Sequence, residues 1–339
     1  MYNDDDLEAA VAAGALNADA VARFRQFMAQ RRLPSTADEE NFRLTTSFND
    51  IFVAIAALLI LVAVAWLGRR IDPALGDLAV VAAAWGLAEY FTRRRGMALP
   101  SILLLLGFVG GAFGLGIDTL DGGVLPSGDW PPQTIYGLAA ALAAAAAFAH
   151  WRRFMVPITV AAGTVAAITT LFGLLLGFVP PLRDFVMPLF LAGGLTLFAL
   201  AMHWDMGDRA RTTRRADVAF WLHLCSAPLM VHPVFSMLGI SVGGGSDIGR
   251  AGAAVALYCA LALVALAVDR RALLVSALFY VLYAMTALFQ AAGSSSASLA
   301  VTALVIGSAL LLLSAFWRNA RRLVVGLLPP TLTARLPVI

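Results

Sequence analysis

Residues 51–67 read IFVAIAALLILVAVAWL, a stretch of seventeen residues without a charged side chain. As an α-helix, such a stretch extends about 25 Å, and the hydrocarbon core of a bilayer is about 30 Å thick. Nine further, largely apolar stretches follow it, at residues 74–91, 98–117, 133–150, 154–178, 185–203, 218–240, 251–268, 272–290 and 298–316. The sequence therefore predicts a chain that crosses a membrane about ten times.

The composition supports the same class of protein. Of the 339 residues, 60% are hydrophobic and 13% are charged, with a mean hydropathy of +0.83, whereas soluble proteins carry about 25% charged residues. This excludes a soluble globular protein, and two cysteines exclude a disulfide scaffold. Because lipid offers no partners to backbone polar groups and the apolar runs lack strand alternation, we expect an all-α, polytopic transmembrane helical bundle.

The distribution of positive charge predicts the orientation. All 24 basic residues are arginines. With the N-terminus in the cytoplasm, fifteen of them fall in inner loops and the C-terminal tail, four in outer loops and five before the first span. This excess on the inner side follows the positive-inside rule. We therefore expect a multi-pass protein of the bacterial inner (cytoplasmic) membrane with both termini cytoplasmic.

Three regions are predicted: a cytoplasmic N-terminal helical segment (1–49), a ten-span transmembrane domain (50–322) and an interfacial C-terminal tail (323–339). In the first region, a helix from Asp4 should end at Gly14 in a left-handed cap, and a second helix should start with Asn17 as its N-cap. This hairpin either docks on its own membrane domain or binds a protein partner. The remaining partner that we expect is membrane lipid.

A resemblance accompanies this N-terminal segment. Residues 11–20, VAAGALNADA, followed by a short helix and a run of Ala/Leu-rich spans, resemble the start of bacterial membrane proteins grouped as domain-of-unknown-function family 2157. Residues 41–44, NFRL, and 47–52, SFNDIF, are similar to an entry sequence of uncharacterised proteobacterial inner-membrane proteins. The likeness covers about the first 60 residues. It implies a fold and no activity.

The seventh span carries the least regular sequence. Residues 222–233 read LHLCSAPLMVHP and place Pro228 and Pro233 five residues apart. Each proline removes a backbone hydrogen bond, so this helix is predicted to be kinked or broken near mid-membrane. Broken helices expose polar backbone at the depth where transporters bind solutes, which makes Ser226, Pro228, His232 and Pro233 candidate substrate-binding residues. The alternative is a packing kink with a hydrogen-bonded core histidine.

The other three histidines suggest a second candidate site. His150, His203 and His223 are expected at a similar depth near the inner ends of their spans, with Asp205 and Asp208 nearby. If these helix ends converge, the imidazoles can bind a transition metal. The alternative is that His150 and His203, each followed by Trp, are interfacial belt residues.

Other charged and small residues within the spans are expected to be structural. Glu89 should pair with Arg93 one turn later. Glycines spaced by four, at Gly107 and Gly111 and again at Gly173 and Gly177, predict closely packed helices. A nucleotide-binding loop, zinc-type spacing and a nucleophile elbow are all missing from the sequence, so we expect no catalytic residue, no cofactor and no nucleic-acid partner.

Three functions are compatible with these features. A small-solute permease fits the ten spans and the irregular seventh span, and is favoured. A non-catalytic membrane scaffold or assembly protein fits the scarcity of charge inside the spans. A membrane-embedded enzyme has only the histidines in its support and is the least favoured.

The predicted topology can be tested with reporter fusions. Fusions at Arg95, at Arg211 and after Arg322 should report a cytoplasmic location, whereas fusions at Gly128 and Gly243 should report a periplasmic one, because the arginine count fixes the orientation of each loop. Alkaline phosphatase and fluorescent-protein activities provide the measurement. Inversion of any one fusion contradicts the ten-span topology.

Overall fold

The computed structural model describes residues 11–31, 48–121, 130–211, 213–239, 248–291 and 298–337. The chain divides into two compact units, residues 1–42 and 43–339. In these described ranges the secondary structure is helical, with no strand. The all-α prediction is confirmed.

The first unit contains α2 (Ala18–Arg31). The side chain of Asn17 accepts a hydrogen bond from the Asp19 backbone N–H at 3.0 Å, which confirms Asn17 as the N-cap. Gly14 adopts the left-handed conformation, with φ of 71°, and its N–H bonds the carbonyl of Val11. Most of the first predicted helix lies outside the described residues.

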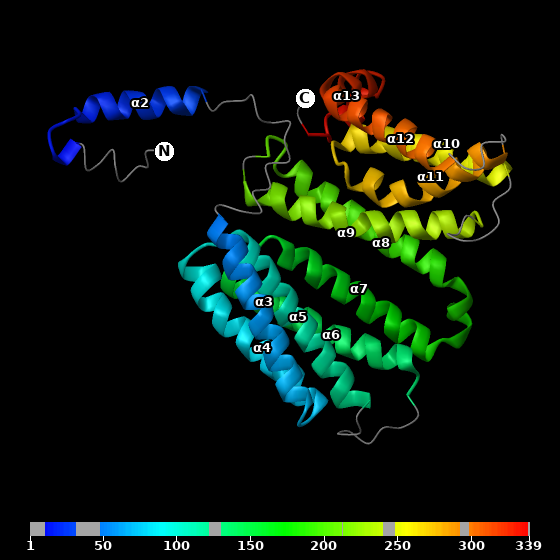
Figure 1. Ribbon diagram of the computed structural model, residues 1–339, viewed down its shortest axis with the longest axis horizontal. Helices are drawn as coiled ribbons and strands as arrows, with labels where there is room; N and C mark the ends of the chain where they lie inside the picture. The colour runs from blue at the N-terminus through cyan, green and yellow to red at the C-terminus, as the bar shows by residue number, and fades with distance from the viewer. Residues whose placement is uncertain are drawn as a thin grey trace. The chain divides into compact units, whose positions relative to one another are not determined.

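The second unit is a series of long helices (Figure 1). In chain order they are α3 (Phe48–Arg69), α4 (Pro73–Ala88) with the π-helical turn η1 (Glu89–Arg94), α5 (Ala98–Asp121), α6 (Pro132–Phe154), α7 (Ile158–Phe178), the 3₁₀ turn η2 (Pro180–Phe185), α8 (Val186–Met206), α9 (Arg214–Met237), α10 (Ile248–Val268), α11 (Ala272–Ala291), α12 (Ser298–Ala315), α13 (Trp317–Gly326) and α14 (Pro330–Thr333).

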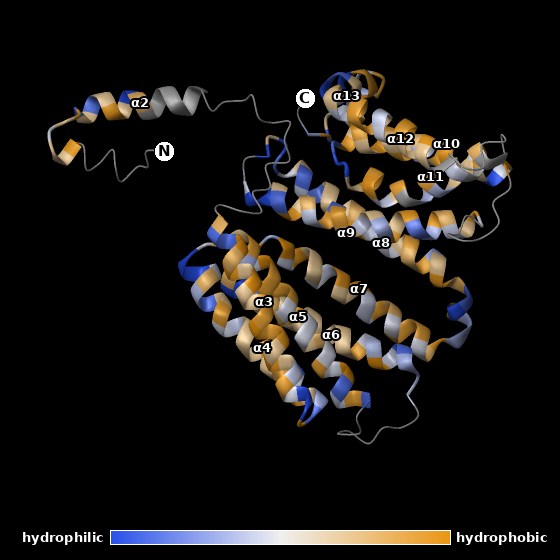
Figure 2. Cartoon of the chain, in the orientation of Figure 1, coloured by the Kyte–Doolittle hydropathy of each residue, from blue (hydrophilic) through white to orange (hydrophobic). Residues whose placement is uncertain are grey.

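Each of the ten predicted spans coincides with one of these helices. Among the described residues, eight helices, α3 to α10, are long and apolar enough to cross a membrane, and the bent pair α12 and α13 would add a ninth. α11 (Ala272–Ala291) occupies the remaining predicted span. Figure 2 shows apolar residues along the lengths of the helices and polar residues gathered near their ends. The chain therefore has the helices of a polytopic membrane protein.

The polypeptide turns sharply between α12 and α13. The two helices meet at 76°, and α13 has Arg318 and Arg322 exposed while Trp317 and Arg321 are buried. The predicted boundary of the C-terminal tail, between residues 322 and 323, thus falls inside α13, and the change of direction occurs before Trp317.

Helices α3 to α7 form one group, the first half, and α8 to α13 form another, the second half. Within the first half, each helix packs against the next along the chain, and α3 also packs against α5. In the second half α9 packs against α8 and α11, while α10 packs against α11 and α13. The halves meet mainly where α7 packs against α9 and α8.

Apolar side chains form the contact between the halves. Ala161 of α7 belongs to a buried cluster with Leu197 and Ala201 of α8 and Leu222 of α9. In addition, Trp221 of α9 packs against Leu105, Val156 and Ile158 of the first half.

The predicted close packing is present at most of the glycines. A Cβ atom on Gly173 of α7 would lie 2.6 Å from the Cα of Gly137 on α6, so these backbones touch. Gly111 of α5 faces Val80 and Val81 of α4. Gly110, by contrast, has nothing within 4 Å of its Cβ position.

This contrast predicts the effects of two alanine substitutions. Gly173→Ala should lower the free energy of unfolding by about 1–3 kcal/mol, because the new methyl group would force α6 and α7 apart. Gly110→Ala should leave it unchanged or raise it by about 0.5–1 kcal/mol, because alanine restricts the unfolded chain without a clash. Detergent-induced unfolding followed by circular dichroism measures both. Equal effects would contradict the close packing of α6 and α7.

Candidate functional site

A buried group of charged side chains lies near one end of the second half. Asp205, near the end of α8, accepts a hydrogen bond from Arg270 Nη2 to Oδ1 at 2.6 Å, and its Oδ2 lies 3.0 Å from His223 Nε2 on α9. The three side chains are 1% to 4% exposed. One carboxylate therefore joins α8, α9 and the link between α10 and α11.

Asp269, which directly precedes Arg270 in the sequence, is a second buried hydrogen-bond acceptor. Arg211 Nη1 donates to its Oδ2 at 2.7 Å, and Trp317 Nε1 donates to its Oδ1 at 2.7 Å. Arg321 Nε lies 3.8 Å from the same Oδ1, and its Nη2 donates to the carbonyl of Pro337 at 2.8 Å. We call Asp205, Arg211, His223, Asp269, Arg270, Trp317 and Arg321 the ionic cluster.

Local backbone conformation places these side chains. Asp269 has φ of 59° and Arg211 has φ of 53°, in the left-handed region that Asp tolerates better than most residues. The link between α8 and α9 is held by Asp208, whose Oδ2 accepts bonds from the N–H of Thr213 at 2.8 Å and from its hydroxyl at 2.7 Å. Thr213 in turn caps α9, because its Oγ1 accepts from the N–H of Arg215.

The cluster contains buried side chains of opposite charge, and their burial affects the pKa of Arg211. Arg211 lies in the link outside the long helices, and burial lowers the pKa of its guanidinium. The nearby Arg270 cation lowers this pKa further, whereas Asp269 opposes both effects. Removing one member of such a group strands the other charge away from water, which is far more costly than removing both.

His223 is the member of the cluster whose ring can exist in a neutral or a cationic form. A neutral His223 can donate its Nε2 proton to Asp205, and a second proton would make the ring cationic. Because Asp205 also binds Arg270, the added charge would compete for one carboxylate. Ionisable residues inside membrane spans are often functional, which makes this cluster a candidate site.

The structure does not bring the three proposed metal ligands together. His150 is fully buried in α6, where its Nδ1 lies 3.2 Å from Thr159 Oγ1 and its ring contacts Trp85 and Phe154. His203 is exposed on α8, and His223 belongs to the ionic cluster. In the part of the chain that the structure describes, no three His, Cys, Asp or Glu residues are grouped to hold a metal. The predicted metal site finds no support.

The candidate substrate residues of α9 divide between two faces. The helix is continuous from Arg214 to Met237 through both prolines, so of the two predicted alternatives, a kink or a break, the break is wrong. Ser226 and Pro233 are buried, and the Ser226 hydroxyl donates to the carbonyl of His223 at 2.9 Å. Pro228 and His232 are exposed.

His232 also lies away from the middle of its helix. It is five residues from the end of α9, and its Nδ1 is hydrogen-bonded to the Tyr280 hydroxyl of α11. The assignment of a solute site to His232 and its neighbours stays a prediction.

Two smaller ionic groups occur in the first half. Glu89 pairs with Arg93 at 3.4 Å, as predicted, and accepts two bonds from Arg153 of α6, at 2.6 and 2.9 Å. Asp77 of α4 accepts from Arg69 of α3 at 2.7 Å and fills the space left by the missing side chain of Gly114. Each group joins neighbouring helices of the same half.

No family model matches the chain, and no curated protein or solved structure matches it. The resemblance to family 2157 therefore stays a prediction.

The aspartates of the inner loops are the sequence feature that points to the ionic cluster, and a count of arginines alone does not include them. Asp205, Asp208 and Asp269 interrupt an otherwise basic set of inner loops, and Asp269 directly precedes Arg270. Carboxylates among so many arginines indicate pairing. The partners, however, are separated by up to 65 positions, so only the tertiary structure identifies them.

Substitutions in two ion pairs should separate buried from exposed interactions. Arg270→Gln should lower the free energy of unfolding by about 3–5 kcal/mol, because the Asp205 carboxylate is left buried without its main cation. Arg153→Gln, which removes the partly exposed partner of Glu89, should have a much smaller effect. Unfolding in mixed detergent micelles measures both variants.

The double variant Asp205→Asn with Arg270→Gln completes this test. It should recover part of the lost stability, because neither charge then remains unpaired. A double variant that is as unstable as the sum of its single variants would show that Asp205 and Arg270 do not act as a pair.

Proposed function

We propose that this chain is a permease for a small solute in the bacterial inner membrane, with both termini in the cytoplasm. One observation carries the proposal: each ion pair described above joins elements of the same half, whereas the contact between the halves is built from apolar side chains. In transporters of several folds, two helical groups rock against each other around a solute site. Such motion requires that the helices within each group keep their relative positions and that the two groups can shift along their contact.

Ion pairs connect neighbouring elements within both halves, and those of the second half are the more deeply buried. In the second half, Asp205 and Asp269 join α8, α9, α13 and the two links between helices, at distances of 2.6–3.0 Å for the shortest contacts. In the first half, Glu89 joins η1 to α6 and Asp77 joins α4 to α3. Directional, charge-assisted bonds of this kind favour one geometry.

The contact between the halves has a different chemistry. Ala161 of α7 packs with Leu197 and Leu222, and Gly193 of α8 faces Ile168 and Phe172 of α7. Apolar contacts lack directional bonds, so small shifts along this surface cost less than the rupture of an ion pair. Sliding of packed helices is one of the recognised routes of domain movement.

The number of helices also supports this proposal. Each half contributes five of the ten proposed spans, so two consecutive halves would enter the membrane from opposite sides. Many transporters have halves of opposite orientation. The halves are not copies of one another, because α9, the second helix of its half, packs more extensively against α11 than against α10, whereas α4, the second helix of the first half, packs against α5.

Distance measurements between the halves test this mechanism. Spin labels at Ile71 of the first half and Ile248 of the second, both exposed, should show two distance populations in lipid bilayers, because the halves occupy two arrangements. Labels at Ile71 and Trp130, both in the first half, should show one. Double electron–electron resonance of a variant lacking Cys225 and Cys259 provides the measurement.

Transport itself is measured by the swelling of protein-containing vesicles in panels of amino acids, sugars and polyols. At least one class of solute should enter faster than into protein-free vesicles. A single distance population together with no solute entry would contradict the permease and favour the scaffold.

A further inference from the structure

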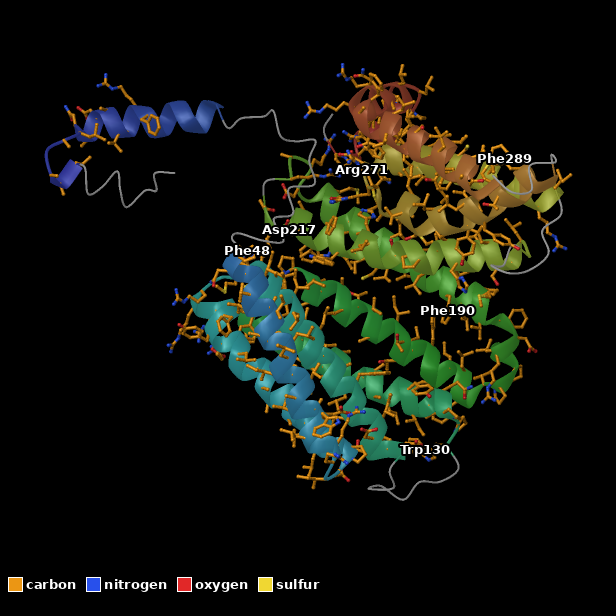
Figure 3. All side chains as sticks on the ribbon, viewed as in Figure 1. Phe48, Trp130, Phe190, Asp217, Arg271 and Phe289 are labelled. Atoms are coloured by element: carbon orange, nitrogen blue, oxygen red, sulfur yellow. The ribbon has the colours of Figure 1, made fainter. Side chains whose placement is uncertain are left out.

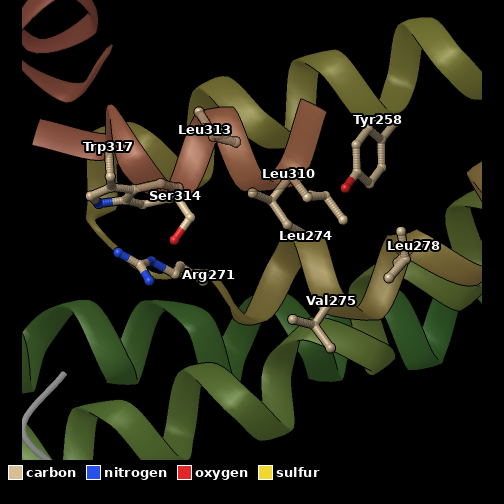
Figure 4. Close-up of a pocket in the computed structure, with 9 residues that line it drawn as sticks. All are labelled: Tyr258, Arg271, Leu274, Val275, Leu278, Leu310, Leu313, Ser314 and Trp317. Carbon is tan, nitrogen blue, oxygen red and sulfur yellow. The ribbon is translucent and has the colours of Figure 1, made fainter. Parts of the chain in front are cut away.

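An apolar groove lies between α10, α11 and α12 (Figure 4). Its walls are formed by aliphatic side chains of α11 and α12, with Trp317 at one end and Tyr258 of α10 at the other. The aliphatic lining residues are Leu274, Val275, Leu278, Leu310 and Leu313. The cavity has a volume of about 120 Å³, and it opens on the surface of helices that are apolar enough to lie in lipid.

The groove has a cationic end. Arg271, which directly precedes α11, lines the groove and is exposed, and its Cζ lies 4.8 Å from the centroid of the Trp317 ring. Packing over an aromatic ring restricts the guanidinium, while the N–H groups, which lie in the plane of the guanidinium, can still donate to a ligand. Figure 3 places Arg271 at the same end of the second half as Asp217, away from Phe289.

The dimensions of the groove limit what can occupy it. From Arg271 to Leu278 the helix rises about 10 Å, which is about two thirds of one leaflet of a 30 Å hydrocarbon core. A helix of a second protein, about 10 Å in diameter, is too thick for a cavity of about 120 Å³. An acyl chain is thin enough and lies in the surrounding solvent.

The charge at the groove's end selects the headgroup of that lipid. Guanidinium groups bind phosphate oxygens with two parallel hydrogen bonds. α13, which begins with the groove residue Trp317, exposes a further arginine, Arg322, about one turn later. A lipid with a net negative headgroup is therefore favoured over a zwitterionic one.

We propose that this groove binds one anionic phospholipid, with the phosphate on Arg271 and an acyl chain along Leu274, Leu278 and Leu310. The site is on the arginine-rich side of the membrane. It does not depend on transport, because the same contacts would exist in a scaffold. Trp317 connects it to the ionic cluster, since its ring carries Arg271 while its Nε1 donates to Asp269.

Native mass spectrometry of the full-length protein in mild detergent tests this site. Phosphatidylglycerol and phosphatidylcholine with identical acyl chains are added separately, and the retained lipid adducts are counted. The wild type should retain phosphatidylglycerol preferentially. Arg271→Gln should weaken its binding about five-fold to ten-fold, the loss expected for one basic contact with an anionic headgroup, and should leave phosphatidylcholine unchanged.

A second variant addresses the acyl chain. Ser314→Phe places a ring in the groove, where Ser314 is an exposed lining residue, and leaves Arg271 in place. It should lower the retention of both lipids. Retention of phosphatidylglycerol at the wild-type level in this variant would show that the chain does not lie in the groove.

The matched control is Arg70→Gln. Arg70 also stacks on a tryptophan, Trp66, with its Cζ 4.7 Å from the ring centroid, but it lies in the link between α3 and α4. Its loss should not change the adduct count. An equal decrease in Arg70→Gln and Arg271→Gln, or equal binding of the two lipids by the wild type, would overturn the proposal.

Discussion

Lipid constrains this molecule in two ways. It offers no partner to a charged side chain, and it offers no hydrogen-bond partner to a backbone amide. The second requirement produces the helices. The first is met at Asp205 and Asp269, which accept bonds from side chains of α9, α13 and the two links that flank α9 and α11. The arrangement of the second half depends on these two carboxylates, because each fixes segments that are far apart in the sequence.

The first half is held more by shape than by charge. Gly173 allows α6 and α7 to touch at Gly137, and Ala84, Ala88 and Leu104 fill the interior between α4 and α5 without a polar contact. Its ion pairs, at Glu89 and Asp77, are near the helix ends. Where the halves meet, a small side chain of α7 packs with small and aliphatic side chains of α8 and α9.

Trp317 takes part in several contacts of the second half. Its indole N–H is bound by Asp269, its ring supports Arg271, and it is the first residue of α13 after the 76° bend. The C-terminal segment is further attached by Arg209, which donates to the carbonyl of Leu336 at 2.8 Å, and by Arg321 on Pro337. A lipid bound at Arg271 would therefore rest against the same indole that anchors the end of the chain.

The sequence by itself determined the class of the fold, the position of each long apolar helix from α3 to α12 and the small cap at Asn17, because these depend on local properties: apolar length, backbone bonding and the side chain next to a helix start. It also indicated Glu89 with Arg93, one turn apart. Only the tertiary structure decided that Arg153 is the closer partner of Glu89, that Arg270 pairs with Asp205 across 65 positions, and that His150 and His223 have unrelated surroundings. Partners at that separation depend on which helix faces pack together. Hydropathy does not specify this choice, because in an apolar solvent nearly every face of an Ala- and Leu-rich helix is equally acceptable to lipid, and the packing is decided by the few glycines and buried charges.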